Sequence, residues 1–212
     1  MPETLLIDGS STSSPDGGIP QQPVTPYHVI YMSDPFDVNR PTTHSNFAAG
    51  GEVLSDISGR AATVIAVFSD APALNILTLQ LGQNDFIANG PYANDVPRWV
   101  PDVQALLATY RTGADGRLLK IGLTTQNPRN DATFLGTRTA VNNAIRGLVR
   151  DGYADFLVDW AVDPMYGQDA DVSDPTKYLD GTHPSQANQN NMEAAYYRLA
   201  LNALYLDDGN RA

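Results

Sequence analysis

Short apolar runs alternate with segments of helical periodicity along most of the chain. Apolar runs that suit buried strands lie at residues 5–7, 27–32, 74–81, 118–123 and 156–160. Apolar residues recur at helical spacing in residues 53–68, 100–110, 132–150 and 186–205. Because strands and helices alternate, the sequence predicts an α/β fold with a mainly parallel sheet covered by helices on both faces.

Three other segments lack this periodicity, and one glycine weakens it within a predicted helix. Residues 15–26 are rich in Pro and Gly, residues 35–46 are polar and irregular, and residues 165–179 are rich in Asp, so all three are predicted to be loops. Gly59 is a weak point in the helix predicted at 53–68. The last helix is predicted to bury one stripe of residues: Met192, Ala195, Tyr196, Leu199, Ala203 and Leu204.

The stretch Asp180-Gly181-Thr182-His183-Pro184 carries the clearest candidate chemistry. A turn of this length can bring the Asp180 carboxylate back onto the His183 imidazole. The carboxylate would then fix one ring nitrogen and leave the other as a general base. The alternative is a structural turn, in which Asp180 is a cap and Pro184 opens a helix.

Three further positions fall where the predicted topology puts the carboxyl ends of strands. Ser10 follows the first strand, Gly51 precedes a helix, and Asn84 follows a central strand. Ligands of open α/β sheets gather at this edge, so we expect these residues to share a pocket with Asp180 and His183.

Taken together, these stretches resemble the SGNH hydrolases, also called the GDSL esterase/lipase family. The Gly-x-Asn-Asp block of the family is matched by residues 82–85 (GQND), and its Asp-x-x-His-Pro block by residues 180–184 (DGTHP). Its first block, Gly-Asp-Ser-x-Thr, is matched by residues 8–12 (DGSST). Residues 46–51 (NFAAGG) match the block with a glycine after an Asn, and Gly51 is aligned with that glycine, with Gly50 as the alternative.

The resemblance implies a three-layer α/β/α sandwich with a flavodoxin-like five-stranded sheet, in a single SGNH hydrolase-like domain over residues 1–212. It implies a carboxylic ester hydrolase that forms an acyl-enzyme with the triad Ser10, His183 and Asp180. The implied oxyanion donors are the backbone N–H groups of Ser10 and Gly51 and the side-chain amide of Asn84. No cofactor or metal is expected.

The sequence departs from the family pattern in two places. Gly and Asp stand in reversed order before the serine, so Asp8 points to the other face of the strand. This leaves a one-residue slip to Ser11 open, although Ser10 keeps Thr12 in register. Residues 13–45 show no amphipathic helix of the kind that family members usually place there, and we expect this segment to build the substrate mouth.

The polar, Pro-rich mouth favours short acyl esters, such as acetyl groups on carbohydrate, over long-chain lipids. Two alternatives use the same scaffold: an acyltransferase, and a non-catalytic carbohydrate-binding pseudoenzyme. Asp85 is interpreted as structural support for the site.

Charge and composition limit the kinds of partner that the sequence predicts. The net charge of -11 disfavours nucleic acid and anionic membrane surfaces, and no apolar run reaches transmembrane length. The lack of Cys excludes disulfides, zinc–thiolate sites and thiol nucleophiles. Residues 1–4 lack the features of a signal peptide, so we expect a cytoplasmic protein or one that has lost its leader. A small-molecule or carbohydrate ester is the expected partner, and the oligomeric state is open.

Other candidate residues carry weaker signals. His28, within a predicted strand, and His44 are expected to have no special role. Asp169, Asp171 and Asp174 have a spacing that suits calcium, but the loop lacks the glycine and distal glutamate of an EF-hand, which favours a solvated acidic loop. Four aromatic residues in or near the expected rim could stack on a sugar or acyl chain, or have a core or surface role: Phe36, Tyr92, Trp99 and Tyr178.

Overall fold

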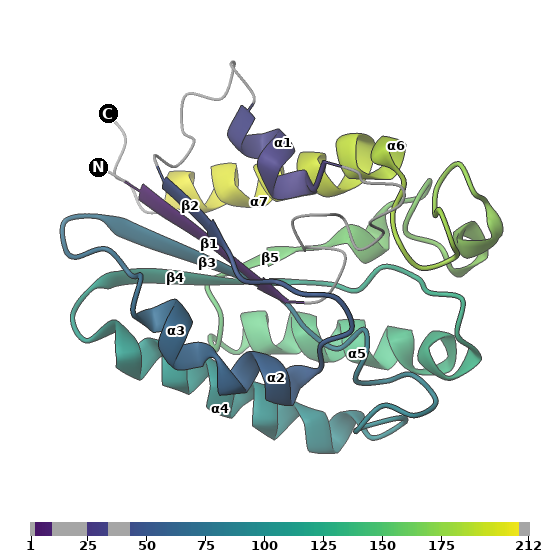
Figure 1. Cartoon of the computed structure of the whole chain (residues 1–212), viewed down its shortest axis with the longest axis horizontal. Helices are drawn as coiled ribbons and strands as arrows, with labels where there is room; N and C mark the ends of the chain where they lie inside the picture. Colours follow the sequence, from purple (N-terminus) through teal and green to yellow (C-terminus); the bar gives the residue numbers. More distant parts are fainter. Residues whose placement is uncertain (1–2, 10–24, 34–42, 208–212) are drawn as a thin grey trace.

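A computed structural model describes residues 3–9, 25–33 and 43–207. Its centre is one sheet of five parallel strands in the order β2-β1-β3-β4-β5 (Figure 1). This is the flavodoxin-like order, so the predicted sheet is confirmed. The strands are β1 (Glu3–Gly9), β2 (Thr43–Asn46), β3 (Leu74–Gln80), β4 (Leu118–Thr124) and β5 (Phe156–Val158).

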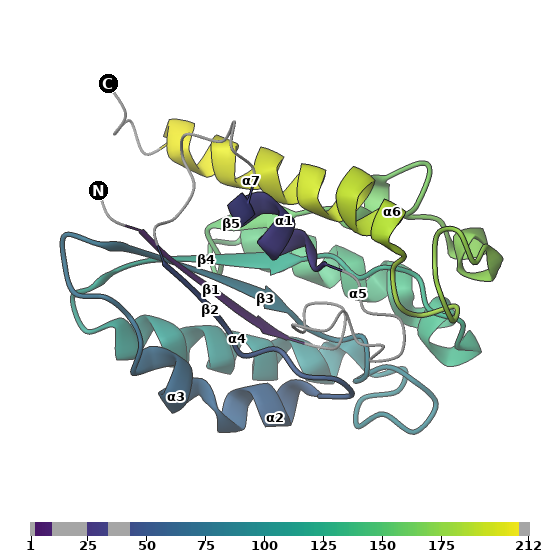
Figure 2. The ribbon, with the colours of Figure 1, turned by 45° about the horizontal axis from the view of Figure 1, so that its top comes forward.

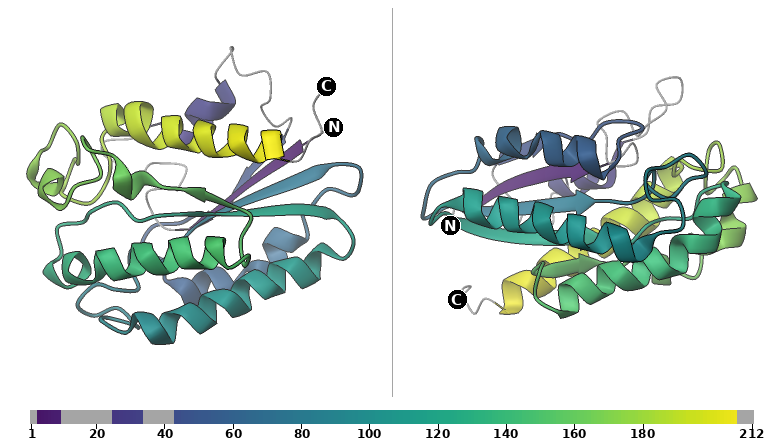
Figure 3. Two further views of the ribbon diagram at one scale, coloured as in Figure 1. Left: turned by 180° about the vertical axis from the view of Figure 1, so that it is seen from behind. Right: turned by 90° about the horizontal axis from the view of Figure 1, so that it is seen from below.

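Helices cover both faces of the sheet and complete the three layers (Figures 1 and 3). Side chains of β1 alternate between the two apolar cores, with Leu6 in one core and Leu5 and Ile7 in the other. Leu6 faces a layer that consists of α2 (Leu54–Gly59), α3 (Ala61–Ile65), α4 (Val96–Ala114) and α5 (Ala132–Arg150). Leu5 and Ile7 face the layer with α1 (Tyr27–Ser33), α6 (Gln186–Asn188) and α7 (Ala194–Asp207).

Local capping signals set two of the helix boundaries. The Asp131 side chain accepts a hydrogen bond from the Phe134 N–H at 2.9 Å, and α5 has the predicted bounds. Asp95 likewise accepts from the Arg98 N–H at 3.1 Å, so α4 begins at Val96 and not at residue 100. The predicted strands near residues 5–7, 74–81, 118–123 and 156–160 are confirmed.

The prediction of a strand at residues 27–32 is wrong, because these residues form helix α1. Tyr27 and Tyr31 are buried, whereas Val29, which a strand would place on the same face, is exposed. The Tyr27 ring packs edge-on against Trp160 and Tyr197, with centroids 5.0 Å apart in both pairs. This tertiary packing overrides the strand preference of aromatic and β-branched residues.

The remaining strand is β2, in a segment predicted to be irregular. Its sequence THSN has no aliphatic residue, and its first two residues are exposed. It pairs with β1 at the edge of the sheet, where a polar strand is tolerated because solvent lies on its outer side.

Two helical segments depart from the prediction in detail. The helix predicted at 53–68 is split at Arg60 into α2 and α3, next to Gly59. Ahead of α7, a π turn (Gln189–Glu193) inserts an extra residue and rotates the stripe that follows. Leu199, which is 65% exposed, and Ala203 are therefore exposed, against the prediction, and Ala195 and Tyr196 are only half-buried. Met192 and Leu204 are buried as predicted, together with Ala194, Tyr197, Leu201 and Tyr205.

Within the described ranges, none of the helices combines the length and the apolar character needed to cross a bilayer.

Candidate active site

The carboxyl ends of the strands gather at one end of the sheet (Figure 2). In the register of the sheet, Ile7 of β1 lies beside Asn46 of β2, and Gly9 lies beside Gln80 of β3. The loops that leave these ends carry the predicted oxyanion residues.

The predicted nucleophile directly follows Gly9. Ser10 and the alternative Ser11 both lie outside the described residues, as does Phe36. The geometry of the site is therefore described from its remaining candidates.

Asp180 and His183 are in direct contact. The Nδ1 atom of His183 lies 2.9 Å from Oδ2 of Asp180. The other carboxylate oxygen accepts hydrogen bonds from the backbone N–H groups of Thr182 (3.0 Å) and His183 (2.8 Å). Partial burial opposes ionisation of Asp180, but these bonds from His183 and Thr182 outweigh it and hold the pKa of Asp180 below its usual range. A carboxylate oxygen can only accept a hydrogen bond, so this contact places a proton on Nδ1 of His183.

The turn that presents His183 depends on Gly181. This glycine has a φ of +74°, and a Cβ there would lie 2.8 Å from the Cβ of Asn130. Its carbonyl oxygen accepts the Asn130 N–H at 2.6 Å, which ties the turn to the loop after β4.

Asn84 lies in the loop after β3 and is 6% exposed. Its Nδ2 donates to the backbone carbonyl of Glu52 at 2.9 Å, next to Gly51. Its Oδ1 accepts from Nη1 of Arg129, in the loop after β4, at 2.6 Å. Three loops therefore meet at this one amide.

Gly51 has a φ of +80°, while a Cβ there would meet no atom within 4 Å. Glycine is required for its backbone conformation and not for lack of space. The adjoining start of α2 is anchored by Asp85, whose Oδ1 accepts the Leu54 N–H at 3.0 Å. Burial raises the pKa of Asp85 to about 6, although this bond opposes the shift. This contact accords with a supporting role for Asp85.

An ion-pair network lies beneath the Gly51 loop. The guanidinium of Arg60 contacts the buried Asp8 carboxylate, with Nε 2.8 Å from Oδ1, and also pairs with Glu52. Asp8 Oδ1 further accepts the Gly9 N–H at 2.8 Å. Arg60 thus connects the end of β1 to the loop that carries Gly51.

Two predicted rim aromatics are buried instead. Trp99 is fully buried against Phe86, with ring centroids 5.4 Å apart. Tyr178 is also buried, and its hydroxyl donates to the Tyr166 carbonyl at 2.7 Å. Both are contained in the packed interior, so neither can stack on a substrate at the rim.

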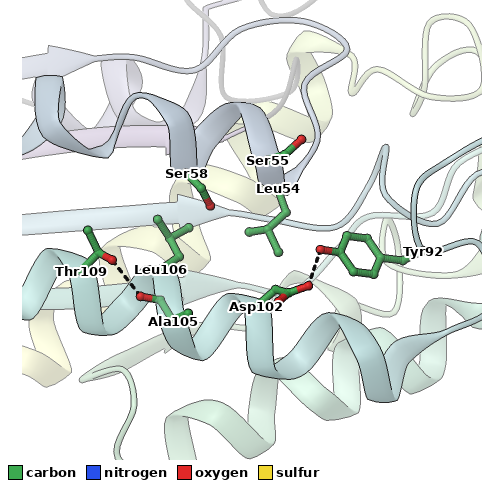
Figure 4. A pocket seen from close by; sticks show the side chains of 8 residues that line it. All are labelled: Leu54, Ser55, Ser58, Tyr92, Asp102, Ala105, Leu106 and Thr109. Atoms are coloured by element: carbon green, nitrogen blue, oxygen red, sulfur yellow. Dashed lines mark hydrogen bonds between the residues drawn. The ribbon is translucent and has the colours of Figure 1, made fainter.

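A groove of about 360 Å³ lies between α2 and α4 (Figure 4). The half-buried Tyr92 lines one end of it and donates its hydroxyl to Asp102 at 2.7 Å. Of the predicted triad and oxyanion residues that the structure describes, none lines this groove. Its lining consists of Leu54, Ser55, Ser58, Tyr92, Asp102, Ala105, Leu106 and Thr109.

His28 is a buried residue of α1 and not a strand residue. Its Nε2 lies 3.0 Å from Nδ2 of Asn46, and its ring lies 5.0 Å from that of His44. Burial, with a smaller contribution from His44, lowers the pKa of His28 to about 3. The neutral ring therefore links α1 to β2.

Two carboxylates of the acidic loop pair with basic side chains, one on α5 and one within the loop. Asp169 pairs with Arg138 at 2.5 Å and Asp171 pairs with Lys177 at 2.7 Å. Asp171 is buried, so the loop is less solvated than expected. Over the described ranges, no group of three or more His, Asp or Glu side chains is arranged to hold a metal ion.

Two arginines of the described site, Arg60 and Arg129, are not among the predicted site residues. Arg129 follows β4 at the carboxyl edge, so the topological rule that selects Ser10 and Asn84 also applies to it. The local sequence around Arg60 holds no comparable signal, because its partners Asp8 and Glu52 come together only in the fold.

The family model for GDSL-like lipase/acylhydrolase proteins matches residues 14–195. No match is found among curated proteins. A GDSL-like lipase from Bacteroides thetaiotaomicron has a similar structure, with a TM-score of 0.65 and 15% identity over 96% of this chain and 88% of the other. For a variant of Axe2, an acetyl xylan esterase from Geobacillus stearothermophilus, the TM-score is 0.64 at 16% identity, covering 95% of this chain and 93% of the other.

The chain is also similar to the Bacillus subtilis protein YxiM, with a TM-score of 0.62 and 17% identity. It aligns over 98% of its own length but spans only 57% of that protein. All three likenesses concern the fold.

Proposed function

Because the chain belongs to the GDSL-like lipase/acylhydrolase family and is a carboxylic ester hydrolase, we propose that it is a serine esterase for short-chain acyl esters. The substrate class would be carbohydrate that carries O-acetyl groups. One observation carries the proposal: Asp180 holds the Nδ1 atom of His183 at 2.9 Å. A base oriented in this way is what a serine nucleophile requires.

In this proposal Ser10 Oγ attacks the ester carbonyl carbon while Nε2 of His183 accepts the hydroxyl proton. Asp180 keeps the tautomer and stabilises the imidazolium that forms. The bond between the carbonyl carbon and the alcohol oxygen then breaks, and His183 gives the proton to the leaving alcohol. Water attacks the acyl-enzyme by the same steps and restores the Ser10 hydroxyl.

The negative oxygen of each tetrahedral intermediate would bind three donors: the N–H groups of Ser10 and Gly51 and the amide of Asn84. Asn84 Nδ2 carries two N–H groups. The Glu52 carbonyl takes one of them, so the other can serve the oxyanion.

The preference for short acyl groups is supported by the likeness to an acetyl xylan esterase. We expect p-nitrophenyl acetate and butyrate to be hydrolysed faster than the decanoate. A rate maximum at ten carbons or longer would overturn this preference and leave the esterase assignment intact.

A fluorophosphonate probe with peptide mapping tests the nucleophile. We expect the wild type and Ser11→Ala to be labelled at Ser10, and Ser10→Ala to remain unlabelled. Labelling at Ser11 would assign the nucleophile to Ser11 in place of Ser10. An unlabelled wild type would contradict the mechanism. Product analysis with and without an alcohol acceptor separates hydrolysis from acyl transfer.

A further inference from the structure

A guanidinium group lies directly behind the amide that the proposed function places in the oxyanion hole. Arg129 donates from Nη1 to Oδ1 of Asn84 at 2.6 Å. On the other side, Nδ2 of Asn84 donates to the Glu52 carbonyl at 2.9 Å. Asn84 is only 6% exposed, so water cannot easily replace either interaction.

These two neighbours leave the amide a single orientation. A guanidinium can only donate hydrogen bonds, and a backbone carbonyl can only accept them. Rotating the Asn84 amide by 180° would set its NH₂ group against Arg129 and its oxygen against the Glu52 oxygen. The amide oxygen is therefore kept on Arg129, and Nδ2 is kept on the side of the Gly51 loop.

The charge of Arg129 strengthens its hydrogen bond to the Asn84 amide. Burial lowers the pKa of the guanidinium, while the nearby carboxylates of Asp131 and Asp180 oppose the shift, and an arginine remains charged at neutral pH. A charged donor makes a strong bond to the Asn84 oxygen and polarises the amide, which makes its N–H groups better donors.

The next residue ties the same loop to the proposed base. The Asn130 N–H donates to the Gly181 carbonyl at 2.6 Å, within the turn that contains Asp180 and His183. The loop after β4 thus contacts both the oxyanion side and the base side of the site.

On the basis of the proposed function, we propose that Arg129 is a positioning residue that orients and polarises the Asn84 amide for oxyanion binding. It acts through Asn84, so its effect should depend on that side chain being present.

A double-mutant cycle with p-nitrophenyl acetate tests this dependence. We expect Asn84→Ala to lower kcat about 10²- to 10³-fold and Arg129→Met about 10- to 100-fold, with KM changed less than about threefold. In the Asn84→Ala background, Arg129→Met should cost less than about threefold, because the amide that it orients is absent.

Arg150→Met is the matched control, since it removes the same charge at the far end of α5, where Arg150 pairs with Asp151. We expect its kcat to equal that of the wild type. Arg129→Lys should recover part of the loss, because one ammonium N–H can reach Oδ1. If Arg129→Met does not fold, as judged by thermal unfolding, Arg129→Lys takes its place in the double-mutant cycle with Asn84→Ala.

Equal kcat values in Arg129→Met and Arg150→Met would overturn the inference while leaving the esterase standing. The inference would also be overturned if the falls in kcat caused by Arg129→Met and Asn84→Ala were fully additive in the double variant. Normal turnover in Asn84→Ala would remove the oxyanion assignment and the role of Arg129 with it. A wild type that hydrolyses no ester would contradict the proposed function, and the inference would fall with its premise.

Discussion

At the scale of single residues, Gly9 has a backbone conformation that suits the reversed order of Gly and Asp ahead of the serine. Its φ is +145°, and a Cβ there would lie 2.6 Å from the Gln80 carbonyl oxygen of the neighbouring strand. A side chain at this position is therefore excluded by the sheet itself. The carboxylate stands one position earlier, where Asp8 reaches Arg60 on the opposite face and still accepts the Gly9 N–H.

We expect Gly9→Ala to destabilise the protein by about 1–3 kcal/mol, because it adds a steric clash to an unfavourable backbone conformation. Gly136→Ala is the control, since Gly136 lies in the interior of α5 with open space around its Cβ position. That variant should gain up to about 1 kcal/mol from helix propensity. Urea unfolding measures both, and equal midpoints for the two variants would refute the steric argument.

Asp180 supplies a second prediction at this scale. Asp180→Asn preserves the shape of the side chain but can favour the wrong imidazole tautomer, so kcat should fall by about 10³- to 10⁴-fold. Asp174→Asn, in the same loop, removes a carboxylate that accepts hydrogen bonds from Thr176 and should leave kcat unchanged. Ester hydrolysis and thermal unfolding of the two variants make the comparison. Similar activities would contradict a role for Asp180 in orienting His183.

At the scale of elements, the π turn ahead of α7 places a carboxyl group in the interior. Glu193 is fully buried and accepts a hydrogen bond from the Asn127 side chain. The Trp160 indole donates to its backbone carbonyl at 3.3 Å. Burial raises the pKa of Glu193 to about 8, so the group is largely protonated in the folded protein at neutral pH.

This burial makes the stability of the fold depend on pH. The folded-state pKa of Glu193 is raised, so its contribution is fully present below the unfolded pKa of about 4.5 and is lost as the pH rises through about 8. Glu193→Gln cannot ionise and can still accept from Asn127. Its stability relative to the wild type should therefore grow by roughly 2–4 kcal/mol between pH 5 and pH 8. Urea midpoints at the two pH values give this difference, and parallel pH profiles would rule out an ionising Glu193.

At the scale of the whole molecule, the sequence predicts four of the five described strands because they are short apolar runs, and those of β1 and β3 are buried on both faces. It predicts most of the helices because their periodicity reflects burial on one face. It misses α1, whose aromatic residues are buried against Trp160 and Tyr197, partners that lie far away in the chain. The same limit holds at the site. The contact between Asp180 and His183 is local and predictable, whereas Arg129 reaches Asn84 only after two loops have been brought together.

Among the described residues, three buried carboxyl groups have raised pKa values: Asp8, Asp85 at about 6 and Glu193 at about 8. Each loses its contribution to stability as the pH rises through its folded-state pKa. Self-repulsion within a chain of net charge -11 acts in the same direction. Asp180, whose pKa is lowered, contributes stability that is lost at lower pH.

We therefore expect the urea midpoint of the wild type to be highest near pH 5 and to fall steadily through pH 7 and pH 9. A midpoint that rises from pH 5 to pH 9 would contradict the dominance of the buried acids.

The sheet ends on both sides in its shortest strands, since β2 has four residues and β5 has three, against seven in each strand between them. An open strand edge offers a row of N–H and C=O groups to which a strand of another polypeptide can add. Here that row is short at both margins, and at β2 it is flanked by polar side chains. These two described margins therefore offer only a short template for the addition of a further strand.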